Sequence, residues 1–189
     1  MFNDLTSVKE YLATRRSGKP RDMVSPGPDQ ITLQQILEMA TRTPDHGKLF
    51  PWRLIVIQDR KTFAALLETA FVRANTDARQ AQIDAIIAPA FMAPTLVALV
   101  FAPQASAKIP IWEQQMSVGA VGMNLLHAAH AHGFVGSWIT GWACYDPNIA
   151  EALCTGDEKL AGFFYIGSAA NALEERPRPD PTDIIRHWP

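Results

Sequence analysis

The chain has 189 residues, of which 48% are hydrophobic and 19% are charged, and its formal net charge is −2. This length suffices for one domain that buries roughly 70% of the surface of its unfolded chain. No uncharged apolar run reaches the ~20 residues of a membrane span, and the scattered basic residues give no attraction for nucleic acid. We therefore expect a soluble globular protein with neither a membrane nor a nucleic-acid partner.

The N-terminus and the cysteines bear on where the protein works. The first six residues, Met-Phe-Asn-Asp-Leu-Thr, lack the basic segment and apolar core of a secretory signal. Cys144 and Cys154 have the spacing of neither a metal site nor a redox motif, and such a pair is typical of reduced side chains. The expected location is the cytoplasm.

A first helix is predicted over Val8–Thr14, because Ser7 and Glu10 have the spacing of a capping box. The helix ends at the basic segment Arg15–Ser17. Paired guanidinium groups and a hydroxyl can bind a phosphate, but basic residues at a helix end also complement the helix dipole. Both interpretations remain open from these residues alone.

A second helix is predicted over Thr32–Thr43, where a Thr-x-x-Gln capping box begins it. The loop that follows contains Pro44 and Pro51, which restrict its backbone, because each proline fixes its own φ and disfavours helical geometry in the preceding residue. A stiff loop of this kind suits an anionic or hydrogen-bonding ligand, although a basic helix end followed by a rigid turn is equally consistent. Its cationic or titratable side chains are Arg42, His46 and Lys48.

Four strands are predicted from runs of apolar and β-branched residues, at 53–58, 95–101, 134–140 and 162–167. Further helical segments are predicted at 61–73, in the second half of 74–88, and at 147–153. Strands separated by helices indicate an α/β or α+β domain rather than a helical bundle. Residues 171–189 are rich in proline, so we expect an arm that is disordered or lies across a partner subunit.

The longest predicted helix, Trp112–His132, would extend about 30 Å and end before Gly133. Its first residues, Trp112 and Glu113, either face a ligand or serve as a packing anchor and a helix-start charge. Its middle, Met116–Met123, is small and apolar nearly all round. A small domain has difficulty covering such a helix on every side. We therefore predict that a second copy of the chain covers part of it in a symmetric homodimer.

Several catalytic motifs are absent from the sequence. It contains no Gly-x-Gly-x-x-Gly, Gly-x-x-x-x-Gly-Lys, Gly-x-Ser-x-Gly or His-Glu-x-x-His segment, which removes the usual support for Rossmann, P-loop, serine-hydrolase and zincin chemistry. His127, His130 and His132 suggest a metal site, since the first two lie three residues apart on a helix. No acidic residue or cysteine joins them locally, and the helix dipole also favours histidines there, so we predict no metal site.

Four segments taken together resemble one known family over nearly the whole chain. They are Arg15-Arg16-Ser17, Arg42-Thr-Pro-Asp-His46 leading to Pro51-Trp52, Pro110-Ile-Trp112-Glu113-Gln-Gln-Met116-Ser117, and Gly133-Phe-Val-Gly136-Ser-Trp138. In this order they resemble the small, minimal branch of the flavin-dependent nitroreductases. The resemblance implies an α+β fold of three layers, with a central mixed sheet of about four to five strands flanked by helices, in an obligate homodimer. It also implies one domain over 1–189, with 171–189 as its C-terminal arm.

The resemblance further implies two FMN molecules at the subunit interface, reduced by NADH or NADPH. The positions that match the flavin contacts are Arg15, Arg16 and Ser17 for the phosphate and nearby ribityl or ring atoms, Arg42 and His46 from the other subunit, and Trp138, Ile139 and Thr140 along the ring. The segment that matches the nicotinamide nucleotide is Ala128, Ala129, His130, Ala131, His132 and Gly133. One departure is Phe50, where many relatives carry a polar amide, so ring contacts from that loop are lost or replaced.

The implied reaction passes a hydride from the nicotinamide to the flavin and then electrons to nitro compounds, quinones or similar acceptors, in a ping-pong cycle. Because the flavin carries the chemistry, no side chain is predicted to be catalytic, and Arg16 is the candidate that stabilises the negative charge of the reduced ring. Two alternatives are a flavin-binding sensor or carrier without turnover, and a metal-dependent hydrolase that uses His127, His130 and His132.

Overall fold

The computed structural model describes residues 1–106 and 108–189. Its α-helices are α1 (Val8–Thr14), α2 (Gln30–Ala40), α3 (Arg60–Ala74), α4 (Gln80–Ile87), α5 (Ile111–Ala131), α6 (Pro147–Leu153) and α7 (Pro181–Ile184). Its strands are β1 (Met23–Val24), β2 (Trp52–Val56), β3 (Thr95–Phe101), β4 (Val135–Ile139) and β5 (Lys159–Ala169). Short 3-10 turns are η1 (Pro20–Asp22), η2 (His46–Lys48), η3 (Ala88–Phe91) and η4 (Trp142–Cys144).

Contacts divide the chain into two compact units. The larger unit comprises residues 17–171, which include the whole sheet, and the smaller unit combines residues 1–16 with 172–189. The proline-rich arm is irregular apart from α7 and belongs to the same unit as α1. That the two units form a single domain stays a prediction.

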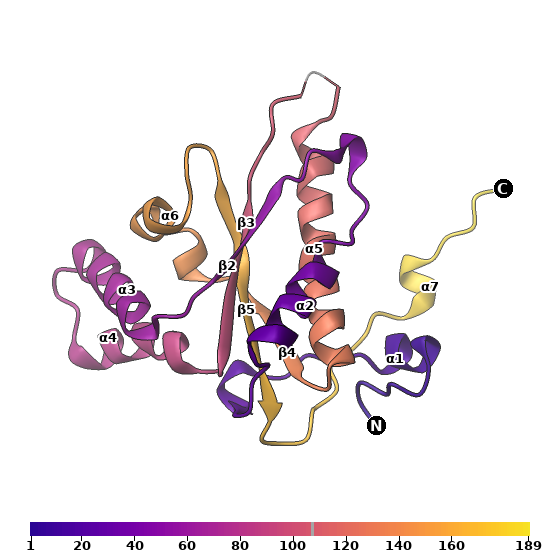
Figure 1. Cartoon of the computed structure of the whole chain (residues 1–189), viewed down its shortest axis with the longest axis horizontal. Coiled ribbons are helices and arrows are strands. Elements are labelled where there is room, and N and C mark those ends of the chain that lie inside the picture. Colours follow the sequence, from indigo (N-terminus) through magenta and orange to yellow (C-terminus); the bar gives the residue numbers. More distant parts are fainter. Residues whose placement is uncertain (107) are drawn as a thin grey trace. The chain divides into compact units, whose positions relative to one another are not determined.

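The larger unit is built on a five-stranded sheet with β5 at its centre. Both β3 and β4 pair with residues 163–166 of β5, so they lie along its two edges. Strand β2 pairs with β3, and β1 pairs with the end of β5. Helices α3, α4 and α6 lie on one side of the sheet, whereas α2 and α5 lie on the other (Figure 1). The α+β class and the three-layer arrangement are therefore confirmed.

The sheet differs from the expected mixed sheet, because each strand pairing in the described residues is antiparallel. Helical segments between strands are typical of crossovers that return the chain in a parallel direction. Two helices, α3 and α4, occupy the connection from β2 to β3. A second helix reverses the chain once more, which is consistent with the antiparallel pairing of β2 and β3.

Element boundaries follow the sequence predictions where the local signals are strong. The predicted bounds of α1, β3 and α6 are confirmed. Helix α2 begins earlier than predicted, because the Asp29 carboxylate accepts a hydrogen bond of 2.7 Å from the Thr32 N–H. Asp29 is therefore the N-cap, and the capping box predicted at Thr32 is wrong.

The main core lies between the sheet and helices α2 and α5. Every side chain of β3 is buried, as expected for a strand that is covered on both faces. On the α5 side, Val121 and Leu125 pack with Phe164 of β5 and Ile36 of α2, and all four side chains have no exposed surface. Burial of each such side chain contributes ~1.5–3 kcal/mol, so this core fixes α5 against the sheet.

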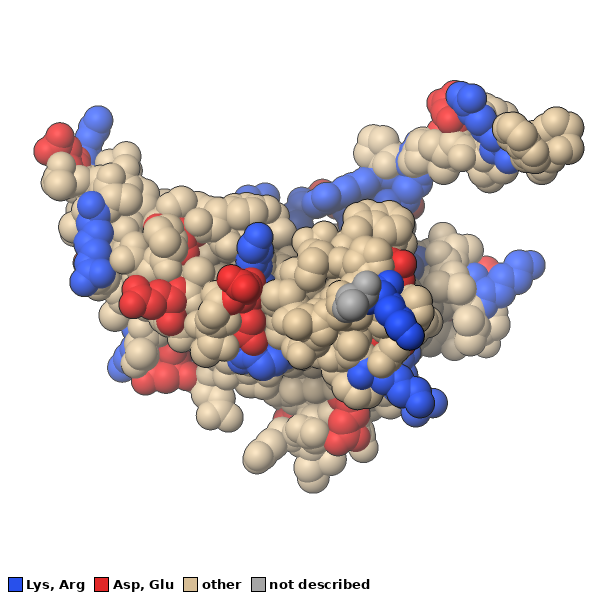
Figure 2. All heavy atoms as spheres, turned by 90° about the horizontal axis from the view of Figure 1, so that it is seen from above, with Lys and Arg blue, Asp and Glu red and all other residues tan. Residues whose placement is uncertain are grey.

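Charges are mixed on the molecular surface. On the face drawn in Figure 2, acidic and basic side chains lie interspersed over most of the surface. Within the part of the chain that the structure describes, no helix has both the length and the apolar character needed to cross a membrane.

Candidate functional site

The end of β4 presents three residues that match flavin-ring contacts. Trp138 stacks on Phe164, with ring centroids 5.1 Å apart and an interplanar angle of 27°, and its indole N–H donates to the Ala161 carbonyl at 3.0 Å. Ile139 is 40% exposed, and Thr140 is also exposed. In this segment, a tryptophan with a fixed indole ring is therefore followed by two residues with accessible side chains.

Two glycines make room for the Trp138 indole. A Cβ at Gly162 would lie 2.1 Å from the indole nitrogen, and a Cβ at Gly122 of α5 would lie 3.0 Å from the ring carbon Cζ3. Gly162 has a φ of +151°, which L side chains rarely adopt. It follows a bulge, because the register of β3 with β5 skips Ala161. The bulge allows the Ala161 carbonyl to accept from the indole.

Ser17, which matches a phosphate contact, lies beside the same strand. The N–H of the next residue, Gly18, donates to the Gly136 carbonyl at 3.2 Å, and a Cβ at Gly18 would lie 3.1 Å from the Val135 side chain. The structure therefore brings the Ser17 backbone to β4, the strand that carries Trp138. Only the folded chain reveals this proximity, since no local pattern links the two segments.

The loop after α2 carries Arg42 and His46 and is held by α5. The Asn124 amide donates to the Arg42 carbonyl at 3.0 Å and to the Thr43 hydroxyl at 2.9 Å. His46 Nδ1 lies 2.7 Å from Glu113 Oε2. Because an ionised carboxylate can only accept, Nδ1 is the donor, and Nε2 is the nitrogen left to face a ligand.

Left-handed backbone shapes the rest of this loop. Gly47, Lys48 and Phe50 have φ values of +78°, +56° and +49°, and the Asp45 carboxylate closes the loop by accepting the Phe50 N–H at 2.7 Å. Such conformations at non-glycine residues cost ~1–3 kcal/mol each and cluster at functional sites. The Phe50 side chain is 61% exposed, and its ring meets Trp52 edge to face. This loop therefore offers an exposed aromatic ring at the position where the resemblance predicts a polar amide.

Helix α5 separates Arg42 from Trp138 within one chain. Trp138 packs against Gly122, whereas Asn124 holds the Arg42 backbone. Positions two residues apart on an α-helix point about 200° apart around its axis. The Arg42 backbone and the Trp138 ring therefore lie on opposite sides of α5.

In the smaller unit, Arg15 and Arg16 follow α1. Asn3 holds the Arg16 backbone, because its Oδ1 accepts the Arg16 N–H at 2.7 Å and its Nδ2 donates to the Arg16 carbonyl at 3.0 Å. The Arg16 side chain is buried, and its Nε donates to the Glu174 carbonyl. The backbone at Arg16 is therefore fixed independently of the guanidinium group.

Two arginines of the C-terminal arm join this cluster, although no sequence motif includes them. Burial lowers the pKa of Arg16, and the charges of Arg176 and Arg178 lower it further. The Glu175 carboxylate, 3.8 Å from the Arg16 Nε, opposes them. A buried cation among further cations gains from binding an anion. A proline-rich segment with no periodicity gives no signal of this contact.

The segment that matches the nicotinamide nucleotide lies at the C-terminal end of α5. Residues 128–130 are buried, and His130 Nε2 accepts the Gly136 N–H at 3.2 Å. Residues 131–133 are exposed or half-buried. Any side-chain contact with a nucleotide would therefore come from Ala131 or His132, and the assignment of the whole segment stays a prediction.

The three histidines of the metal hypothesis are not assembled as ligands. Among residues 1–106 and 108–189, no group of three or more His, Cys, Asp or Glu side chains could hold a metal ion. The Nε2 atom of His130 is occupied inside the core. The hydrolase alternative therefore lacks a ligand set within the described residues.

Solved structures with the same architecture define the fold class. A nitroreductase-like family protein from Bacillus cereus matches with a TM-score of 0.83 at 20% identity, covering 100% of this chain and 99% of that one. NfnB, an FMN and NADPH-dependent nitroreductase from Sphigopyxis sp. strain HMH, matches with a TM-score of 0.75 at 20% identity, covering 97% and 99%. The chain therefore has the nitroreductase-like fold.

Sequence similarity extends the likeness from the fold to the family. The Nitroreductase family model matches residues 12–168. YdjA of Escherichia coli (strain K12), provisionally named an NAD(P)H nitroreductase, is 34% identical over 183 residues, which cover 95% of this chain and 98% of YdjA. The chain belongs to the nitroreductase family.

Proposed function

We propose that this chain is an FMN-dependent oxidoreductase that takes a hydride from NADH or NADPH and passes electrons to nitroaromatic, quinone or similar acceptors in a ping-pong cycle. Family membership supports the oxidoreductase class. The names of its relatives support the cofactors, since YdjA is named for NAD(P)H and NfnB for FMN and NADPH. The flavin, when bound, supplies the redox chemistry, so no side chain is proposed to be catalytic.

The position of α5 is the observation that carries this proposal. Arg42 and Trp138 lie on opposite sides of α5 in one chain. If one flavin contacts both residues, Arg42 must therefore belong to one chain of a dimer and Trp138 to the other. Helix α5 also has an exposed apolar face that a partner can cover. Trp112 is 67% exposed, Met116 is 56% exposed, and a Cβ at Gly119 would meet nothing within 4 Å. An exposed apolar face of this kind marks an interaction site.

The residues present fit a flavin mononucleotide. Its phosphate suits Arg15, Arg16 and Ser17, because guanidinium groups bind phosphate oxygens in pairs and Arg16 is buried among further arginines. Its flat ring suits the accessible segment formed by Ile139 and Thr140. If Arg16 contacts the ring rather than the phosphate, its positive charge would stabilise the negative charge that the ring gains on reduction.

The absorption spectrum of the purified protein tests the flavin proposal. We expect a yellow protein whose flavin absorption bleaches on anaerobic addition of NADH or NADPH and returns on addition of a nitroaromatic compound or a quinone. A yellow protein that neither nucleotide can bleach would indicate a sensor or carrier, and a colourless protein with stoichiometric zinc would indicate the hydrolase alternative. Intersecting double-reciprocal lines in steady-state kinetics would contradict the ping-pong cycle.

Replacement of Gly119 by arginine is expected to convert the dimer into a folded monomer. In a single chain the new side chain has open space, and removal of a helix glycine gains up to ~1 kcal/mol. In a dimer built on this face, the same change buries an unpaired charge, which costs several kcal/mol. Light scattering during size-exclusion chromatography measures the oligomeric state, and circular dichroism confirms the fold.

The matched control is Ala65→Arg, which adds the same charge to the exposed face of α3. This variant is expected to remain dimeric and to keep its FMN. The Gly119→Arg variant is expected to lose FMN together with the dimer, because Arg42 and His46 of a second chain are then missing. A Gly119→Arg protein that remains dimeric and yellow would show that α5 does not form the interface.

A further inference from the structure

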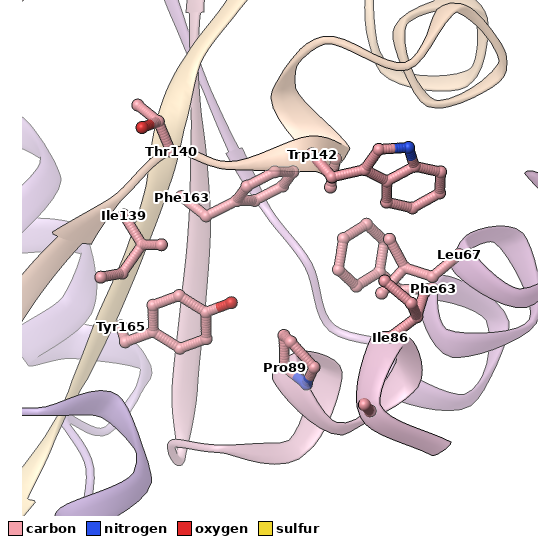
Figure 3. A pocket seen from close by; sticks show the side chains of 11 residues that line it. Phe63, Leu67, Ile86, Pro89, Ile139, Thr140, Trp142, Phe163 and Tyr165 are labelled. Atoms are coloured by element: carbon pink, nitrogen blue, oxygen red, sulfur yellow. The ribbon is translucent and has the colours of Figure 1, made fainter. Parts of the chain in front are cut away.

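A cavity of about 150 Å³ lies in the larger unit between the sheet and helices α3 and α4 (Figure 3). Aromatic side chains form much of its wall, namely Phe63 of α3, Phe163 of β5 and Trp142 of η4. Leu67 and Ile139 contribute aliphatic surface. None of the described residues that line the cavity is charged, so its interior suits an uncharged molecule.

The aromatic wall is held in place by ring contacts. The rings of Phe63 and Phe163 lie 5.5 Å apart at an angle of 48°. Outside the cavity, Phe71 meets Trp142 edge to face, with ring centroids 5.7 Å apart. Such contacts are favourable beyond the area that they bury, and they help to fix the positions of these rings.

One buried hydroxyl in this wall has no hydrogen-bond partner among the residues that the structure describes. Tyr165 of β5 is 4% exposed, and its hydroxyl points toward the middle of the cavity (Figure 3). Among residues 1–106 and 108–189, no group is hydrogen-bonded to this hydroxyl. In those residues, every side-chain oxygen without accessible surface has a hydrogen-bond partner. The Tyr165 hydroxyl has no such partner, so part of its surface must be accessible. Burial raises the pKa of Tyr165 to about 12, so at neutral pH the phenol can both donate and accept.

Size and chemistry together limit what can occupy this space. An apolar cavity of about this volume, lined by Leu, Ile and Phe side chains, accommodates a molecule of the size of benzene. Aromatic walls favour a second ring in an edge-to-face or offset arrangement. An accessible hydroxyl in the wall favours a ligand with a polar group, because an apolar ligand would displace water from the hydroxyl and leave its hydrogen bond unmet, which is costly.

We propose that this cavity binds an uncharged single-ring aromatic molecule with one hydrogen-bonding substituent, of which phenol is the simplest example. The substituent bonds to Tyr165, and the ring packs against Phe63 and Phe163. The inference goes beyond the proposed oxidoreductase function and requires no bound FMN. Ile139 and Thr140 line this cavity and also match flavin-ring contacts, so an occupant would share part of its wall with the proposed flavin site.

Titration of the purified protein with phenol and with toluene, followed by ligand-detected NMR, tests the proposal. Phenol should bind more tightly than toluene. The Tyr165→Phe variant should bind phenol about five- to tenfold more weakly and toluene within about twofold of the wild type. Its thermal stability should not fall, because the lost hydroxyl has no partner. The matched control is Tyr145→Phe at a side chain that is 77% exposed, which should change neither affinity.

A second variant, Ala143→Leu, locates the ligand by filling part of the cavity. It should weaken both probes about tenfold or more while the melting temperature remains close to that of the wild type. Phenol stacked on bound flavin would instead keep its affinity in both variants and perturb the flavin spectrum, which would overturn the proposal. Failure of both probes to bind the wild type at millimolar concentration would also overturn it. FMN content, measured separately, distinguishes either failure from failure of the proposed function.

Discussion

The Gly162→Ala protein is expected to lose about 2–6 kcal/mol in its free energy of unfolding. The new Cβ would lie 2.1 Å from Nε1 and 2.5 Å from Cδ1 of the Trp138 indole. The indole cannot move aside freely, because it donates to the Ala161 carbonyl and stacks on Phe164. Overpacking of this kind costs ~1–3 kcal/mol, and an alanine at a φ of +151° adds ~1–3 kcal/mol of backbone strain.

Urea denaturation measures this loss, and the melting temperature should fall by roughly 4–24 °C. The matched control is Gly156→Ala, since Gly156 also has a positive φ, of +57°, but a Cβ there would meet nothing within 4 Å. The control should lose only the backbone contribution of ~1–2 kcal/mol. Equal losses in the two variants would show that the contact with Trp138 contributes nothing.

Local patterns predict those elements whose signals lie within a few residues. The continuous apolar run of β3 predicts a fully covered strand, and each of its side chains is buried. Pro147 in the first turn of α6 predicts where that helix begins. The start of α2 is less certain from sequence, because Asp29 and Thr32 are both acceptable N-caps. Only the hydrogen bond between them shows that Asp29 is the cap.

Features that depend on strand register cannot be read from the sequence. The bulge at Ala161 exists because Leu99 pairs with Gly162 while Val100 pairs with Leu160. A helical segment between strands likewise does not reveal whether the chain re-enters the sheet parallel or antiparallel. The pattern of strands and helices therefore predicts an α/β or α+β domain, and the resemblance selects α+β, but the sequence predicts neither the antiparallel sheet nor the glycine that accommodates Trp138.

The candidate site shows the same limit. Motifs in the chain indicate Arg42 and His46, but their supports, Asn124 and Glu113, are distant in sequence. Glu113 is ambiguous from its position at a helix start, and only the structure pairs it with His46. Arginines of a proline-rich arm likewise carry no local signal, although their charges act on Arg16. The residue types in a motif suggest which side chains bind a ligand, whereas only the structure shows which other residues hold those side chains in position.

Arg16→Ala is expected to weaken FMN binding by about 100-fold or more. A guanidinium group that binds a phosphate in pairs makes two charge-assisted hydrogen bonds of ~1.5–3 kcal/mol each. The local backbone should keep its course, because Asn3 bonds to the main chain of Arg16 and not to its side chain. Fluorescence titration of FMN into the flavin-free protein measures the affinity, and circular dichroism monitors the fold.

Further variants separate charge from geometry. Arg16→Lys keeps the charge but not the planar fork, so it should recover only part of the lost affinity. Arg15→Ala alters a half-buried side chain and tests the phosphate assignment even if Arg16→Ala folds poorly. Arg21→Ala, at an exposed position in η1, is the control and should stay within about threefold of the wild type, since weak surface charge effects are screened by salt. Wild-type affinity in both Arg15→Ala and Arg16→Ala would place the phosphate elsewhere, and Arg176 and Arg178 would then be the next cations to replace.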